Sequence, residues 1–158
     1  METICHSEDS AFSCAPREGK QYKFAGVEVY IKAFKAETKM QWSLMEYHAP
    51  PGFKGPAPHY HKIMEEGFYV LEGTVTFILE GVQQEIPAGS FLKVPPNTMH
   101  AFSNPAAESA RFLVFMMPGG FEDYYEALLP MIEADKVWPP SDLTALSDLL
   151  EKYDTFSR

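Results

Sequence analysis

Hydrophobic and polar residues alternate over short stretches through the middle of the chain. The pattern is clearest in residues 27–33, where Val27, Val29, Ile31 and Ala33 alternate with more polar neighbours. A period of two predicts a β-strand with one buried face. The same pattern predicts strands at residues 21–26, 40–47, 68–71, 74–80, 82–86, 90–94, 100–103 and 110–117. Short strands separated by turns at intervals of roughly 8–12 residues indicate an all-β sandwich or small barrel.

The pattern changes after the Pro-Gly-Gly sequence at residues 118–120. Apolar residues then recur at helical spacing in residues 121–130 and again in residues 143–153. Pro130 is expected to end or kink the first helix, and Ser141 is expected to cap the second. The two helices are predicted to pack on the outer face of the barrel or to cover one of its mouths. Packing is favoured, because an aromatic stripe at this spacing usually serves packing, and a lid over the site is the alternative.

Length and composition indicate one domain with appendages. The chain has 158 residues, of which 46% are hydrophobic, and this is enough for a single packed core. Residues 1–18 are polar and are predicted to form a flexible leader. Residues 19–118 are assigned to the barrel, and residues 119–158 are assigned to a C-terminal helical extension packed on it.

Charge and cysteine content limit the partners and the compartment. A net charge of −9 argues against nucleic acid and anionic membranes as main partners. The chain shows neither a secretory signal nor an apolar run approaching the roughly 20 residues of a membrane-spanning helix. Cys5 and Cys14 do not make a disulfide framework, so we expect a cytoplasmic protein with two free thiols. A small metal site of Cys5, His6 and Cys14 is the alternative, although its spacing matches no closed zinc pattern.

Potential metal ligands stand near the middle of the chain. His59 and His61 are two residues apart, so both side chains would leave the same face of a strand. Glu65 and Glu66 follow, and His100 is the best candidate for a third histidine. Imidazole and carboxylate groups together suit a divalent transition metal such as Fe, Mn, Ni, Cu or Zn.

Two motifs in the chain resemble those of the cupin superfamily, of the small single-domain, quercetinase-like cupin 2 type. The first motif is matched by His59, His61, Glu66 and Gly73. The second motif is matched by Gly89, Pro95, His100 and Asn104. Asn97 replaces a motif glycine, and asparagine is the residue that best tolerates a left-handed backbone in its place. The resemblance covers roughly residues 42–118.

The resemblance implies a double-stranded β-helix, which is the jelly-roll cupin barrel, with a short C-terminal helical tail. It also implies metal ligands at His59, His61, Glu66 and His100. Simple strand alternation would instead place Glu65 beside the histidines, so Glu66 can face inward only if the chain bulges or turns within residues 62–65. Glu66 is therefore the preferred ligand, with Glu65 as the fallback.

The expected function follows from the implied ligand set. A six-coordinate metal held by these side chains keeps open positions, as a catalytic site requires. Glu66 would act as a ligand and, when released from the metal, as a base. The expected activity is that of a dioxygenase acting on an aromatic or enolisable small molecule in the barrel. The alternatives are a metal-dependent isomerase or epimerase of a sugar-like substrate and a non-catalytic binding protein.

The cavity expected inside the barrel is apolar, and this favours an aromatic substrate. Strand alternation predicts that the cavity is lined by Met45, Phe68, Val70, Phe102, Phe115 and Met117.

The resemblance also implies an assembly. Family members often pair through their outer sheets, so we expect a homodimer.

Overall fold

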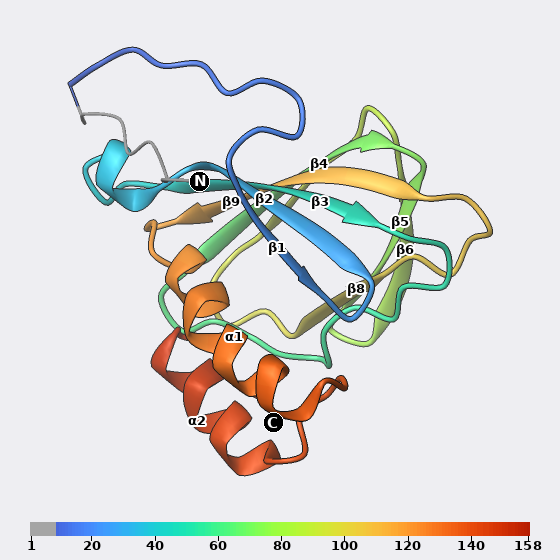
Figure 1. Ribbon diagram of the computed structural model, residues 1–158. Coiled ribbons are helices and arrows are strands. Elements are labelled where there is room, and N and C mark those ends of the chain that lie inside the picture. Colours follow the sequence, from blue (N-terminus) through green and yellow to red (C-terminus); the bar gives the residue numbers. More distant parts are fainter. Residues whose placement is uncertain (1–8) are drawn as a thin grey trace.

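A computed structural model describes residues 9–158 and shows two antiparallel β-sheets with two helices at one end of them (Figure 1). The larger sheet contains, in spatial order, β1 (Lys20–Phe24), β2 (Val27–Ala33), β3 (Ser43–Ala49), β9 (Ala110–Met117), β4 (Glu65–Glu72) and β7 (Phe91–Val94). The smaller sheet contains β6 (Val82–Pro87), β5 (Thr74–Leu79) and β8 (His100–Ser103). A short 3-10 helix, η1 (Lys35–Glu37), occupies the turn after β2. The predicted all-β fold is confirmed.

Aromatic side chains fill the space between the two sheets. Phe68 of β4 meets Phe77 of β5 with ring centroids 4.9 Å apart, and it meets Phe102 of β8 at 5.6 Å. Phe112 of β9 lies 5.6 Å from Phe102. On β9 the buried residues occupy every second position, which places one face of the strand in the core. These rings are part of one continuous hydrophobic core between the two sheets.

The predicted C-terminal helices are present as α1 (Glu122–Asp135) and α2 (Leu143–Lys152). Pro130 was predicted to end or kink the first helix. The prediction that it ends the helix is wrong, because α1 continues to Asp135. A proline removes only one backbone hydrogen bond. Tyr125 and Leu128, both fully buried, anchor this helix on the core.

The cap of α2 differs by one residue from the predicted one. The backbone amide of Ala145 donates to the carboxylate of Asp142 at 2.9 Å, so Asp142 and not Ser141 is the N-cap. Ser141 instead donates its amide and its hydroxyl to the carboxylate of Asp135 at 2.6 and 3.0 Å. Serine and aspartate are about equally favoured at the N-cap position. Sequence preference therefore does not distinguish Ser141 from Asp142, and contacts with the rest of the fold decide which of them caps the helix.

The last residues of the predicted leader are hydrogen-bonded to the larger sheet. Lys32 on β2 donates its ammonium group to the carbonyl oxygens of Ala15 and Glu18 at 2.9 and 2.8 Å. Cys14 is a free thiol in this stretch, whereas the proposed partners Cys5 and His6 lie outside the described residues. Within residues 9–158, neither α1 nor α2 is long and apolar enough to cross a membrane.

Candidate metal centre

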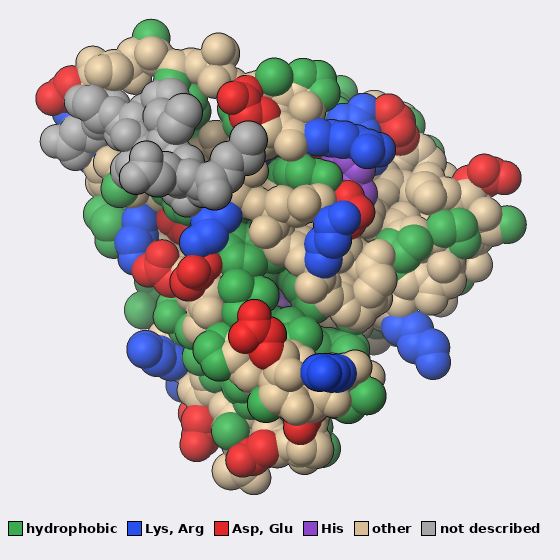
Figure 2. All heavy atoms as spheres, viewed as in Figure 1, with side chains coloured by type: hydrophobic (Ala, Val, Ile, Leu, Met, Phe, Trp, Pro, Cys, Tyr) green, Lys and Arg blue, Asp and Glu red, His purple; other side chains and the backbone are tan. Residues whose placement is uncertain are grey.

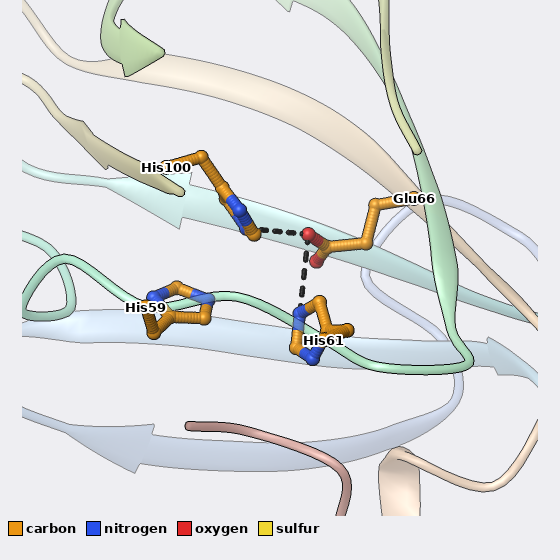
Figure 3. A group of neighbouring side chains, drawn as sticks. All are labelled: His59, His61, Glu66 and His100. Carbon is orange, nitrogen blue, oxygen red and sulfur yellow. Dashed lines mark ion pairs between the residues drawn. The ribbon is translucent and has the colours of Figure 1, made fainter. Parts of the chain in front are cut away.

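Four potential ligands, His59, His61, Glu66 and His100, converge on one point at the helical end of the barrel (Figure 3). One ligand atom from each lies within 4.8 Å of the ligand atoms of the others. All four side chains are buried, and Glu66 and His61 are each only 2% exposed. The structure therefore brings together the complete ligand set predicted from the two motifs.

Backbone pairing places two of the histidines side by side. His59 precedes β4 and His100 begins β8, and their backbones form an antiparallel bridge. The amide of each donates to the carbonyl of the other, at 2.9 and 2.8 Å. Because directly paired residues project from the same face, the two imidazole centroids lie only 4.3 Å apart.

The chain bends at residues 62 and 63, between His61 and Glu66. This is the irregularity that an inward-facing Glu66 requires. Glu65 points away from the histidines and forms an ion pair with Lys93 on β7, with 3.1 Å between the charged atoms. The fallback ligand Glu65 is therefore not part of the cluster.

Each histidine of the cluster is held in one tautomer by the backbone. The Nδ1 atoms of His59, His61 and His100 lie 2.8–2.9 Å from carbonyl oxygens. Those carbonyls belong to Ala57, Asp154 and Thr98. A carbonyl can only accept a hydrogen bond, so each Nδ1 must carry the proton and donate it. Each neutral ring then keeps a free lone pair on Nε2, which is the form that binds a metal.

The atoms that face the centre lack hydrogen-bond partners. Glu66 Oε2 lies 3.3 Å from His61 Nε2 and 2.6 Å from His100 Nε2. Neither contact has hydrogen-bond geometry, and all three atoms are fully buried. Buried polar atoms without partners cost free energy, and a metal ion between them would supply the missing interaction. Imidazole nitrogens with one carboxylate therefore fit a divalent transition metal.

Burial and mutual charge set the protonation of the cluster. Burial lowers the pKa of His59 to about 4, and the neighbouring His100 acts in the same direction. Burial alone would raise the pKa of Glu66, but His100 and His61 beside it hold that pKa well below its usual range. Burial also works against the charge on His61, yet the Glu66 carboxylate raises the pKa of His61 above its usual 6.5. At neutral pH, Glu66 is ionised and His59 is neutral, as metal ligation requires.

Metal affinity is expected to fall as the pH is lowered from about pH 8 to about pH 5, because metal and protons compete for the same imidazole nitrogens. The sign follows from His61, whose raised pKa keeps it protonated at a higher pH than an ordinary histidine. Titrations with Co²⁺, followed by visible absorption at a series of pH values, measure the effect. An affinity that stays constant across this range would contradict ligation by His61.

A cavity of about 370 Å³ opens onto three of the four ligands, His59, His61 and Glu66. Its barrel side includes the apolar and aromatic residues Tyr47, Phe53, Phe102 and Met116. Its other side is formed by the helical extension through Tyr124, Tyr125, Leu146 and Leu150. Figure 2 shows hydrophobic side chains gathered where the extension meets the barrel. The two helices thus contribute core residues and also form part of the cavity wall.

The predicted cavity lining was largely wrong. Of the six expected residues only Phe102 lines the cavity, while Met45, Phe68 and Val70 are fully buried in the core. On β9 the expected face was displaced by one residue, because Met116 and not Met117 lines the cavity. Phe115, the sixth expected residue, also lies outside the lining. The cavity sits at the end of the barrel, so strand alternation alone does not locate it.

Two buried tyrosines place hydroxyl groups in the otherwise apolar part of the cavity wall. The hydroxyl groups of Tyr47 on β3 and Tyr125 on α1 hydrogen-bond to each other. Burial raises the pKa of both phenols, so both stay protonated at neutral pH. Strand and helix patterns gave no signal for this pair, because its members are far apart in the sequence and each is read locally as an ordinary core aromatic residue.

Comparison with known proteins agrees with the geometry. Residues 45–116 match the family described as Cupin domain. The chain is 31% identical to quercetin 2,3-dioxygenase of Bacillus subtilis (strain 168) over 98 residues, which are 62% of this chain and 28% of that relative. The chain therefore matches less than a third of the length of this curated relative.

Solved structures show the same fold. An RmlC-like cupin from Shewanella frigidimarina matches with a TM-score of 0.61 at 20% identity, over 73% of this chain and 96% of that one. A sugar phosphate isomerase of the cupin superfamily from Silicibacter pomeroyi matches with a TM-score of 0.52 at 22% identity, over 58% and 59% of the two chains. At these identities the likeness concerns the fold alone. Residues 45–116 of this chain thus match the cupin domain family, and the buried cluster of metal-ligating side chains lies within them.

Proposed function

We propose that this protein is a metal-dependent dioxygenase that acts on an aromatic or enolisable small molecule. The observation that carries the proposal is the combination of the ligand cluster with the cavity above it. The ligands face a space whose wall is apolar and aromatic, and within residues 9–158 that wall contains neither lysine nor arginine. Such a wall suits a flat, weakly charged molecule.

The metal would be held by His59, His61, Glu66 and His100. Imidazole and carboxylate ligands suit Fe, Mn, Ni, Cu and Zn. A bound metal would lower the pKa of a coordinated substrate hydroxyl and make the resulting enolate or phenolate available to dioxygen. The chain itself supplies the proton acceptor. Glu66 is ionised in its buried position, so its carboxylate, when released from the metal, could take the proton from that hydroxyl.

The remaining wall residues orient the substrate and exclude water. Phe102 and Met116 lie on the barrel side of the cavity and Leu146 on the helical side, so a planar ring would be enclosed by apolar surface. Tyr47 and Tyr125 are both neutral, and within their hydrogen bond one hydroxyl group donates and the other accepts. The proton of the accepting hydroxyl group therefore remains available to a polar substituent of the substrate. Excluding water protects a reactive deprotonated substrate from side reactions.

Similarity to the quercetin 2,3-dioxygenase supports this reading, since quercetin is itself a flat polyphenol. The alternative is a metal-dependent isomerase or epimerase of a sugar-like substrate, and a cupin of known structure is a sugar phosphate isomerase. The absence of lysine and arginine from the described cavity wall counts against a phosphorylated substrate, which basic residues usually hold. A non-catalytic binding protein is the third possibility.

Oxygen uptake tests the proposal. The protein is loaded in turn with each redox-active candidate metal and mixed with a flavonol, and dioxygen consumption is followed with an electrode. We expect uptake that matches substrate loss, with both atoms of isotopically labelled dioxygen recovered in the product. The His100→Ala variant, treated in the same way, is the control and should consume none. Binding of the flavonol without uptake for any metal would leave a binding protein, and isomerisation of a sugar would favour the alternative enzyme.

A further inference from the structure

The C-terminal tail beyond α2 lies against the segment that carries two of the ligands. Tyr60, between His59 and His61, forms a backbone bridge with Phe156. Each amide of this pair donates to the carbonyl of the other at 2.9 Å. The tail therefore extends the backbone pairing of the ligand segment on the side away from His100.

Asp154 connects this tail to the bend that turns Glu66 inward. Its carboxylate accepts hydrogen bonds from the backbone amides of Lys62, Ile63 and Met64, at 3.0, 2.9 and 2.8 Å. These three amides form the bend between His61 and Glu66, so one side chain satisfies donors that the bend leaves unpaired. Three amide bonds to one carboxylate are also charge-assisted, and they are correspondingly strong.

The backbone of the same residue contacts a ligand directly. The carbonyl oxygen of Asp154 accepts the Nδ1 proton of His61 at 2.8 Å. Asp154 has a φ of 58°, in the left-handed region, where aspartate is among the few residues that sit readily. One residue thus fixes both the orientation of His61 and the turn that leads to Glu66.

We propose that Asp154 is a positioning residue of the metal centre and that the tail is a structural part of that centre. The inference rests on metal binding at the proposed site, and it does not depend on which reaction follows. Groups that orient metal ligands typically change metal affinity by roughly 10- to 100-fold when they are replaced. Because coupling between two events is reciprocal, metal binding must also strengthen the attachment of the tail, and with it the end of α2.

The variant Asp154→Asn tests the first half of the proposal. Asparagine has nearly the same size and also tolerates the left-handed region, but it replaces one acceptor oxygen with a donor that faces backbone amides. Asp148→Asn is the matched control, because Asp148 is an exposed aspartate on α2. Competitive titration with Co²⁺ should show an affinity lower by roughly 10- to 100-fold for Asp154→Asn and no change for the control. Circular dichroism of both metal-free variants monitors their folding.

Hydrogen–deuterium exchange of the unaltered protein tests the second half and needs no variant. Adding Co²⁺ should slow exchange in residues 60–64 and in residues 153–156 together. Equal Co²⁺ affinities of the two variants would overturn the proposal while leaving the metal centre intact. Slower hydrogen exchange in residues 60–64 alone, without residues 153–156, would do the same. A wild-type chain that binds no Co²⁺ would overturn this proposal and the metal centre alike. Neither measurement uses oxygen uptake, so its outcome is independent of the proposed reaction.

Discussion

Replacing His100 with alanine is expected to abolish tight metal binding and leave the barrel folded. His100 supplies one of the four converging ligand atoms, and its side chain is completely buried next to Glu66. Removing a direct ligand should cost more than disturbing a residue that only orients one, so we expect a loss of affinity of at least about 100-fold. The backbone bridge between His59 and His100 does not need the imidazole, so β8 should keep its place.

Dialysis against a weak chelator, followed by elemental mass spectrometry, measures the retained metal. His48→Ala is the matched control, because His48 also lies on a strand but contacts Glu46 and not the cluster. The control should retain metal as the wild type does. In addition, metal should raise the melting temperature of the control and not that of His100→Ala, since only a folded state that binds the ion gains stability from it. Full retention of metal by His100→Ala would contradict the assigned ligand set.

Replacing Phe68 with alanine is expected to lower the free energy of unfolding by about 3–5 kcal/mol. Phe68 is 0% exposed and its ring contacts Phe77, Phe102 and Phe112, which belong to both sheets. Truncation removes buried apolar surface and leaves a hole that close-packed aromatic neighbours cannot fill completely. The loss should be comparable to a large part of the stability of an ordinary domain.

Urea denaturation of the metal-free protein measures this loss. Tyr69→Ala is the control, because Tyr69 is the next residue on β4, points to the other face and is 39% exposed. The control should change the free energy of unfolding by no more than about 1 kcal/mol. Similar losses for the two variants would contradict the placement of the core between the sheets.

The sequence predicted the barrel well because alternating strands and their turns are local signals. Val27, Val29 and Ile31 all face the core as the alternation requires, and Asn97 takes the left-handed conformation that replaces the motif glycine. The ligand set was also predictable, since His59, His61 and Glu66 lie within one motif. Choosing Glu66 over Glu65 depended on the motif, because alternation by itself favours the wrong glutamate.

Features that depend on distant parts of the chain could not be predicted. Asp154 contacts the bend at 62–64 and also His61, which is 93 residues away in the sequence. Met116 lines the cavity instead of Met117 because a one-residue shift in alternation reverses the faces of β9. The position of the cavity itself depends on how α1 and α2 meet the barrel, and periodicity shows only that these helices have an apolar side.

The metal content of the purified wild-type protein, measured by elemental mass spectrometry, tests the central claim most directly. The converging side chains predict about one transition-metal ion per chain, bound in the protein as isolated or after incubation with Fe²⁺, Mn²⁺, Ni²⁺, Cu²⁺ or Zn²⁺. A redox-active ion would support oxygen chemistry, and zinc would favour the isomerase alternative. A folded protein that contains no metal and takes up none of these ions would contradict the account.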